Sequence, residues 1–135
     1  MDISNGERNR SLVQSALKNV AAFLNTDGGT LLIGVSDISE IKGLDRDLRY
    51  SHRNNRDGFE QKLRSLLNDR FDPVPYGDAT IKFEDLPAGT ICRVDVEPRE
   101  SITHLDNEVF IRDGNRVKRL QGRELTDWIQ TRNAR

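Results

Sequence analysis

Basic residues gather near the C-terminal end of the chain in a pattern that could bind phosphate. Residues 109–135 hold seven Lys and Arg against three acids, whereas residues 1–108 hold 14 against 19. Five of the seven lie close together: Arg112, Arg116, Lys118, Arg119 and Arg123. The guanidinium and backbone N–H groups of this region could contact phosphate oxygens. Such contacts position a nucleic acid but do not recognise its base sequence. The opposite interpretation is a solvated hairpin whose charges pair with acids elsewhere in the chain.

The charge balance of the whole chain restricts this idea to one region. The chain has 21 Lys and Arg and 22 Asp and Glu among 135 residues, a formal net charge of −1. That balance excludes binding to nucleic acid or membrane by bulk positive charge. The net charge is −5 for residues 1–108 and +4 for residues 109–135. A local phosphate-binding face therefore stays compatible with a nearly neutral protein.

A glycine-rich turn is the second candidate, and it comprises Asn25, Asp27, Gly28, Gly29 and Thr30. Paired glycines let another backbone or a phosphate approach closely. The segment is not a P-loop, because no Walker lysine follows the glycines and Thr30 enters a strand instead of opening a helix. Two interpretations stay open: a structural turn that ends a helix, and a site of ligand contact.

Carboxylates suggest a third chemistry, that of a metal-dependent nuclease. Such an enzyme needs two or three carboxylates that converge on a divalent ion, Mg²⁺ or Mn²⁺, and activate water. Asp37 is the candidate catalytic residue because it follows an apolar strand. The alternative is an ordinary turn residue. The single cysteine, Cys92, excludes a disulfide framework and is predicted to point into the core.

Three helices must position these groups. Apolar residues three and four positions apart predict one amphipathic helix over residues 8–24 and another over residues 56–70. A third apolar group around Trp128 marks a closing helix.

The strands are expected to pair mostly in antiparallel fashion. Residues 30–35 are apolar at successive positions, which is typical of a central strand buried on both sides, and residues 41–44 are predicted as its brief partner. The other strands form two predicted hairpins: 81–84 with 92–96, and 109–112 with 116–120. The order of elements predicts an α+β fold, in which a mostly antiparallel sheet packs with three helices.

The length fits a single domain over residues 1–135. No apolar run reaches the length of a membrane span, and the first residues lack the pattern of a signal peptide. We therefore expect a soluble cytoplasmic protein with no membrane partner.

The first helix, the turn and the strand after it also carry a family resemblance. It lies in residues 17–37 and in residues 41–44, and its most specific part is residues 21–35, AAFLNTDGGTLLIGV. This string resembles the Schlafen-type, Alba-like domain, which is widespread in bacteria and often described as DNA-binding or ATP-binding. Residues 110–115, with Leu120 and Glu124, are similar to the later strand, basic residue, turn and final helix of that family. The resemblance covers residues 11–132.

The resemblance implies an Alba-like or Schlafen-like α+β sandwich that associates with DNA or RNA. In the animal Schlafen branch it also implies a divalent-metal endoribonuclease, which uses two glutamates upstream of the first helix and an aspartate after the glycine-rich strand. Asp37 is the nearest match to that aspartate. In the alternative alignment, shifted by one residue, Ser36 occupies the position of the aspartate. The upstream Glu-x-x-x-x-Glu-Phe-Lys motif has no counterpart, so we expect a fragment or a shortened family member.

Three function hypotheses follow from these observations. The first is a nucleic-acid-binding module of a regulatory protein, without an activity of its own, that contacts the phosphates of DNA or RNA through the basic hairpin. The second is an enzyme: a metal-dependent RNA endonuclease, or a protein that binds or hydrolyses nucleotides, with Asp37 in its site. The third is a dimerisation or protein-interaction module, because Alba-like domains commonly pair.

Overall fold

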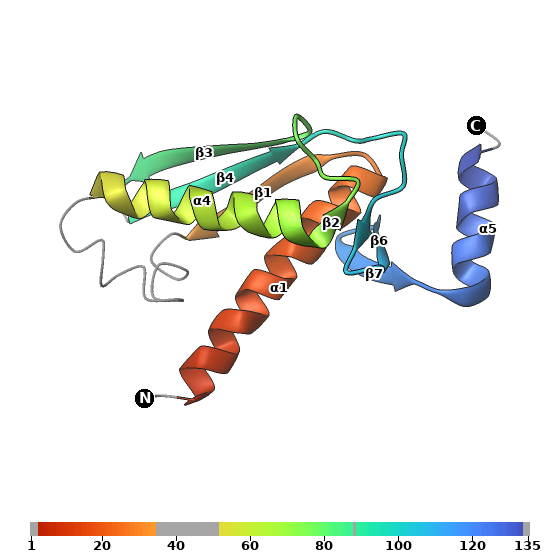
Figure 1. Cartoon of the computed structure of the whole chain (residues 1–135), viewed down its shortest axis with the longest axis horizontal. Coiled ribbons are helices and arrows are strands. Elements are labelled where there is room, and N and C mark those ends of the chain that lie inside the picture. The colour runs from red at the N-terminus through yellow and green to blue at the C-terminus, as the bar shows by residue number, and fades with distance from the viewer. Residues whose placement is uncertain (1–2, 35–51, 88, 134–135) are drawn as a thin grey trace.

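The computed structural model describes residues 3–34, 52–87 and 89–133, and these ranges form an α+β fold (Figure 1). They contain three helices: α1 (Ile3–Asn25), α4 (His52–Arg70) and α5 (Gly122–Asn133). They also contain seven strands: β1 (Gly29–Gly34), β2 (Phe71–Asp72), β3 (Ala79–Leu86), β4 (Gly89–Val96), β5 (His104–Leu105), β6 (Val109–Asp113) and β7 (Arg116–Leu120). All pairs among these strands are antiparallel, so the predicted fold class is confirmed.

The main sheet has three strands in the order β1-β4-β3. The prediction that residues 30–35 are buried on both sides is wrong. Among the described residues β1 pairs with β4, which lies between β1 and β3. Leu31 and Ile33 pack against the core, whereas Leu32 points outward and is 61% exposed. A run of successive apolar residues in a strand therefore does not by itself indicate that both faces of the strand are buried. The expected partner strand at residues 41–44 lies outside the described residues.

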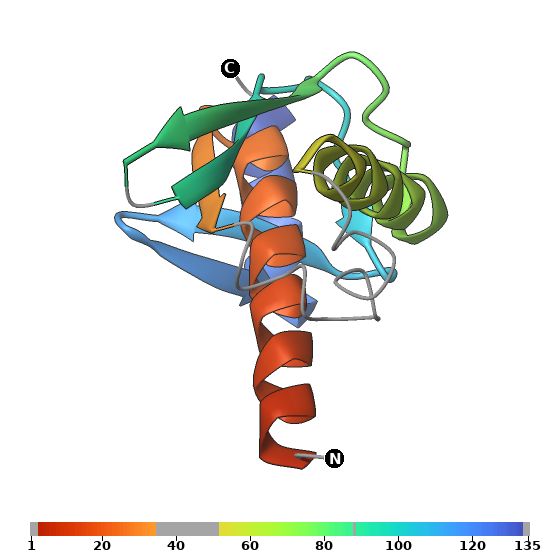
Figure 2. The same cartoon turned by 90° about the vertical axis from the view of Figure 1, so that its left-hand side faces the viewer.

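Helices α1 and α4 cover one face of this sheet (Figure 2). The predicted apolar stripe of α1 is buried from Ala16 onward, and α4 buries Phe59, Leu63 and Leu67 at four-residue steps. The Phe59 ring meets the Phe83 ring of β3 edge to face, with 6.0 Å between centroids. The N-terminal half of α1 extends beyond the rest of the molecule (Figure 1).

The β6–β7 hairpin packs against α1, where Phe110 is buried and Val117 is partly buried. Beyond it, α5 contains no buried residue and lies on the far side of the hairpin from α4 (Figure 1). No helix among the described residues is long and apolar enough to cross a membrane.

Candidate functional site

The glycine-rich turn is held in place by close backbone packing. Gly28 has a φ of 74°, its N–H donates to the Phe23 carbonyl at 2.9 Å, and a Cβ there would lie 2.6 Å from the Val96 carbonyl oxygen. A Cβ on Gly29 would lie 2.6 Å from the Phe23 ring. Both glycines are therefore required by the approach of other parts of the chain, whatever else contacts the turn.

The side chain of Asn25 joins the turn to two distant segments. It is 1% exposed, and its Nδ2 donates to the carbonyls of Thr103 at 2.9 Å and Phe110 at 3.0 Å. Its Oδ1 accepts the Thr103 N–H at 2.7 Å. Thr30 Oγ1 donates to Asp95 Oδ1 at 2.9 Å, and Asp27 is exposed. The polar atoms of Asn25 and Thr30 thus serve contacts within the protein.

The five predicted phosphate-binding cations fall into two groups. Lys118 lies 2.7 Å from a carboxylate oxygen of Glu124 in α5, and Arg119 lies 2.7 Å from one of Glu108. Arg123 is exposed on α5. Arg112 and Arg116 instead border a pocket against α1. Arg116 has a loose pairing with Asp113 at 3.6 Å, and because both side chains are more than half exposed this pairing adds little stability.

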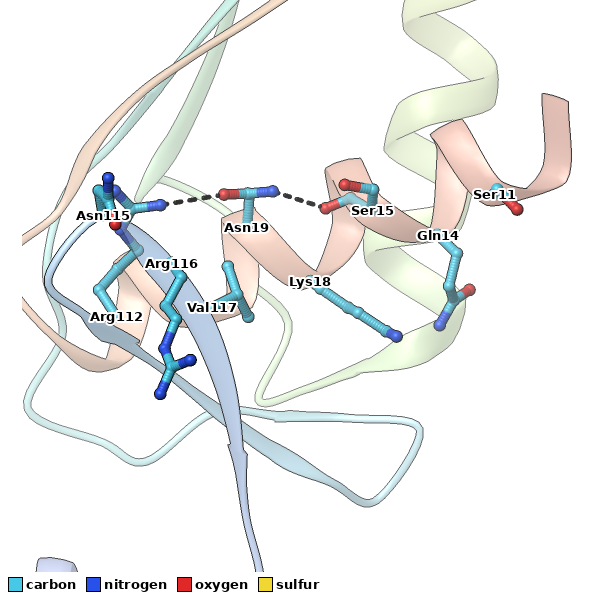
Figure 3. Close-up of a pocket in the computed structure, with 9 residues that line it drawn as sticks. All are labelled: Ser11, Gln14, Ser15, Lys18, Asn19, Arg112, Asn115, Arg116 and Val117. Atoms are coloured by element: carbon cyan, nitrogen blue, oxygen red, sulfur yellow. Dashed lines mark hydrogen bonds between the residues drawn. The ribbon is translucent and has the colours of Figure 1, made fainter. Parts of the chain in front are cut away.

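The pocket has a volume of about 470 Å³ and lies between the middle of α1 and the β6–β7 hairpin (Figure 3). Its lining is Ser11, Gln14, Ser15, Lys18, Asn19, Arg112, Asn115, Arg116 and Val117. Three of these residues are cationic and none is acidic. Phosphate oxygens are suitable ligands for such a lining, because it combines positive charge with hydroxyl and amide donors.

Two contacts fix the guanidinium of Arg112 at one side of the pocket. It stacks over the Phe23 ring, 5.2 Å from the centroid, and donates from Nη1 to Asn19 Oδ1 at 3.4 Å. Asn19 Nδ2 in turn donates to the Ser15 carbonyl at 2.9 Å. This chain of contacts runs along the pocket wall in Figure 3. Arg112 is thereby oriented before any ligand arrives, which lowers the entropy lost on binding.

A hydrogen bond from Arg70 of α4 orients the side chain of Gln14. Arg70 Nη2 donates to Gln14 Oε1 at 2.8 Å, while Arg70 Nε donates to both carboxylate oxygens of Asp106, at 3.0 and 3.1 Å. The hydrogen bond from Arg70 lowers the pKa of Asp106 below its usual value. Because a guanidinium group only donates, the Gln14 oxygen faces Arg70 and its NH₂ group is left for the pocket. In Figure 3 this nitrogen lies on the side of Lys18.

The α1 side of the pocket was missed by reasoning from the sequence. The sequence pattern of residues 8–24 predicted an apolar stripe, yet Ser11, Gln14, Ser15 and Lys18 recur at three- and four-residue steps on the opposite side of α1. Side chains at this spacing share one helix face. A basic residue on a polar helical face was the available signal, and its nearness to the hairpin became visible only in the structure.

The predicted catalytic residue, Asp37, lies outside the described residues. Among the residues that are described, no group of three or more His, Cys, Asp and Glu could hold a metal ion. The described residues therefore supply no set of three such ligands for the Mg²⁺ or Mn²⁺ of the nuclease hypothesis. Cys92 is fully buried in β4, as expected, and burial followed by the charge of Glu60 raises its pKa to about 12. Its thiol stays protonated at neutral pH and belongs to the core.

Comparison with known proteins identifies one family. The family model described as Schlafen, AlbA_2 matches residues 2–121, which is most of the chain and ends just before α5. No curated protein and no solved structure matches the chain.

Proposed function

Since the chain belongs to the Schlafen, AlbA_2 family, which points to a nucleic-acid-related domain, we propose that it binds DNA or RNA through phosphate contacts in the α1–hairpin pocket. The observation that carries this proposal is the convergence of Lys18, Arg112 and Arg116 on one pocket, with no carboxylate among the described side chains that line it. Two elements far apart in the sequence supply these cations, so their convergence is a product of the fold.

Each cation has a distinct part in the proposed contact. Arg112 is held by Phe23 and Asn19 and offers a preoriented guanidinium fork. Arg116 is 73% exposed and can follow a phosphate backbone, while Lys18 adds a compact charge from α1. Lys118, Arg119 and Arg123 extend the basic surface beyond the pocket, with the first two already paired to glutamates.

The test is a charge-matched comparison of binding. We expect the double variant Lys18→Gln/Arg116→Gln to bind short RNA and DNA duplexes about 100-fold more weakly at low salt, because it loses two charge-assisted hydrogen bonds. The control is Lys62→Gln/Lys82→Gln, which removes two exposed lysines of α4 and β3 outside the pocket. Fluorescence anisotropy gives both affinities. Equal affinities for the two double variants would refute the assignment of the pocket.

A further inference from the structure

A second pocket lies at the C-terminal half of α4 and differs in character from the first. It has a volume of about 360 Å³ and is lined by Arg64, Ser65, Leu67, Asn68, Val74, Pro75 and Tyr76. It therefore combines one cation and two small polar side chains with an apolar and aromatic wall. A pocket with one cation is poorly suited to a run of phosphates, whereas an aromatic wall beside polar groups suits a flat, polar-edged ring.

Tyr76 is the aromatic group of this pocket and is 79% exposed. Its segment is nevertheless anchored on both sides. Arg99 donates from Nη1 to the Pro73 carbonyl at 2.9 Å and pairs through Nε with Asp78 at 3.1 Å. Within the segment Pro75 is fully buried, and the Tyr76 N–H donates to the Val74 carbonyl at 3.0 Å. The backbone thus presents an exposed ring from a fixed position.

The polar side of the pocket can recognise the edge of a ring. Arg64 donates from Nη2 to the Ala79 carbonyl at 2.9 Å, which fixes its guanidinium beside the pocket. Asn68 is exposed and carries both a donor and an acceptor, and the Ser65 hydroxyl can act as either. Nucleobases carry donors and acceptors on their edges and stack on aromatic side chains through their faces.

We propose that this second pocket binds an unpaired base of the nucleic acid strand, with Tyr76 stacked on the face of the base and Asn68 and Ser65 at its edge. This inference rests on the proposed function. Helix α4 contributes to both pockets: it lines the second through Arg64, Ser65, Leu67 and Asn68, and its Arg70 donates to Gln14 of the first at 2.8 Å. A single strand held by its phosphates at the first pocket and long enough to reach the second would place one of its unpaired bases there.

The test compares a short single-stranded RNA with a duplex of the same sequence. We expect Tyr76→Ala to weaken single-strand binding about fivefold to 100-fold through the loss of one stacked base, and to leave duplex binding unchanged. Tyr76→Phe keeps the ring and should bind the single strand as the wild type does. Because the side chain is exposed, neither variant should unfold, and circular dichroism verifies this.

The other outcomes separate this inference from the proposed function. If Tyr76→Ala binds the single strand normally while Lys18→Gln/Arg116→Gln does not, the base site is refuted and the phosphate site stands. If Tyr76→Ala lowers the affinity for the single strand and for the duplex equally, the base site is also refuted, since stacking requires an unpaired base. If the wild-type chain binds neither probe, both proposals fail.

Discussion

The glycine-rich turn and the α1–hairpin pocket both carry polar groups on α1, but they use these groups in opposite ways. The side-chain donors and acceptor of Asn25 all form hydrogen bonds with backbone groups of Thr103 and Phe110 inside the protein. In the pocket, Arg70 and Arg112 take the amide oxygens of Gln14 and Asn19, which leaves the lining rich in donors. The difference teaches that a group's internal hydrogen bonds distinguish a structural role from a binding role, even within one helix.

The largest effect should come from the turn and should concern stability. Asn25→Ala removes three hydrogen bonds and strands buried backbone groups of Thr103 and Phe110, so we expect a loss of about 3 kcal/mol in the free energy of unfolding. Urea denaturation measures it. The exposed neighbour Asp27 provides the control, since Asp27→Ala should stay within about 0.5 kcal/mol of the wild type. A destabilisation equal for the two variants would contradict the structural role of Asn25.

A smaller effect, on binding and not on folding, should come from the pocket. Gln14→Glu keeps an oxygen for Arg70 but replaces the NH₂ group by a negative charge in the pocket. We expect nucleic acid affinity to fall about tenfold through repulsion of phosphate. The midpoint of urea denaturation should change little. If this variant binds as tightly as the wild type, the Gln14 side of the pocket does not contact phosphate.

The smallest effect should come from the paired cations outside the pocket. Glu124→Gln releases Lys118 from its ion pair at the surface, and we expect nucleic acid to bind about two- to threefold more tightly. Anisotropy titrations at low salt can resolve this change. A gain as large as the loss in Lys18→Gln/Arg116→Gln would mean that the hairpin surface, and not the pocket, dominates binding.

Much of the fold could be predicted from the sequence, because local patterns determine it. The stripe of α1, the hairpins and the inward position of Cys92 follow from periodicity. The burial of β1 on both faces was predicted wrongly, since burial depends on which other elements cover each face of the sheet. Leu32 of β1 is apolar but faces outward, and nothing local distinguishes it from its buried neighbours Leu31 and Ile33.

The candidate site could be predicted only on its hairpin side. Counting charges by region found Arg112 and Arg116, but it could not separate them from Lys118 and Arg119, whose pairing with Glu124 and Glu108 depends on the register and on the path of the chain. Lys18 was missed because its place beside the hairpin requires the packing of two distant elements, and Lys18 lies more than 90 residues before the hairpin.

The most direct test of the phosphate pocket is the dependence of duplex DNA affinity on salt. The logarithm of the binding constant falls linearly with the logarithm of salt concentration, with a slope set by the number of neutralised phosphates. We predict that Lys18→Gln/Arg116→Gln makes this slope shallower by about 2, while Lys62→Gln/Lys82→Gln leaves it unchanged. Parallel lines for the wild type and both double variants would contradict the account.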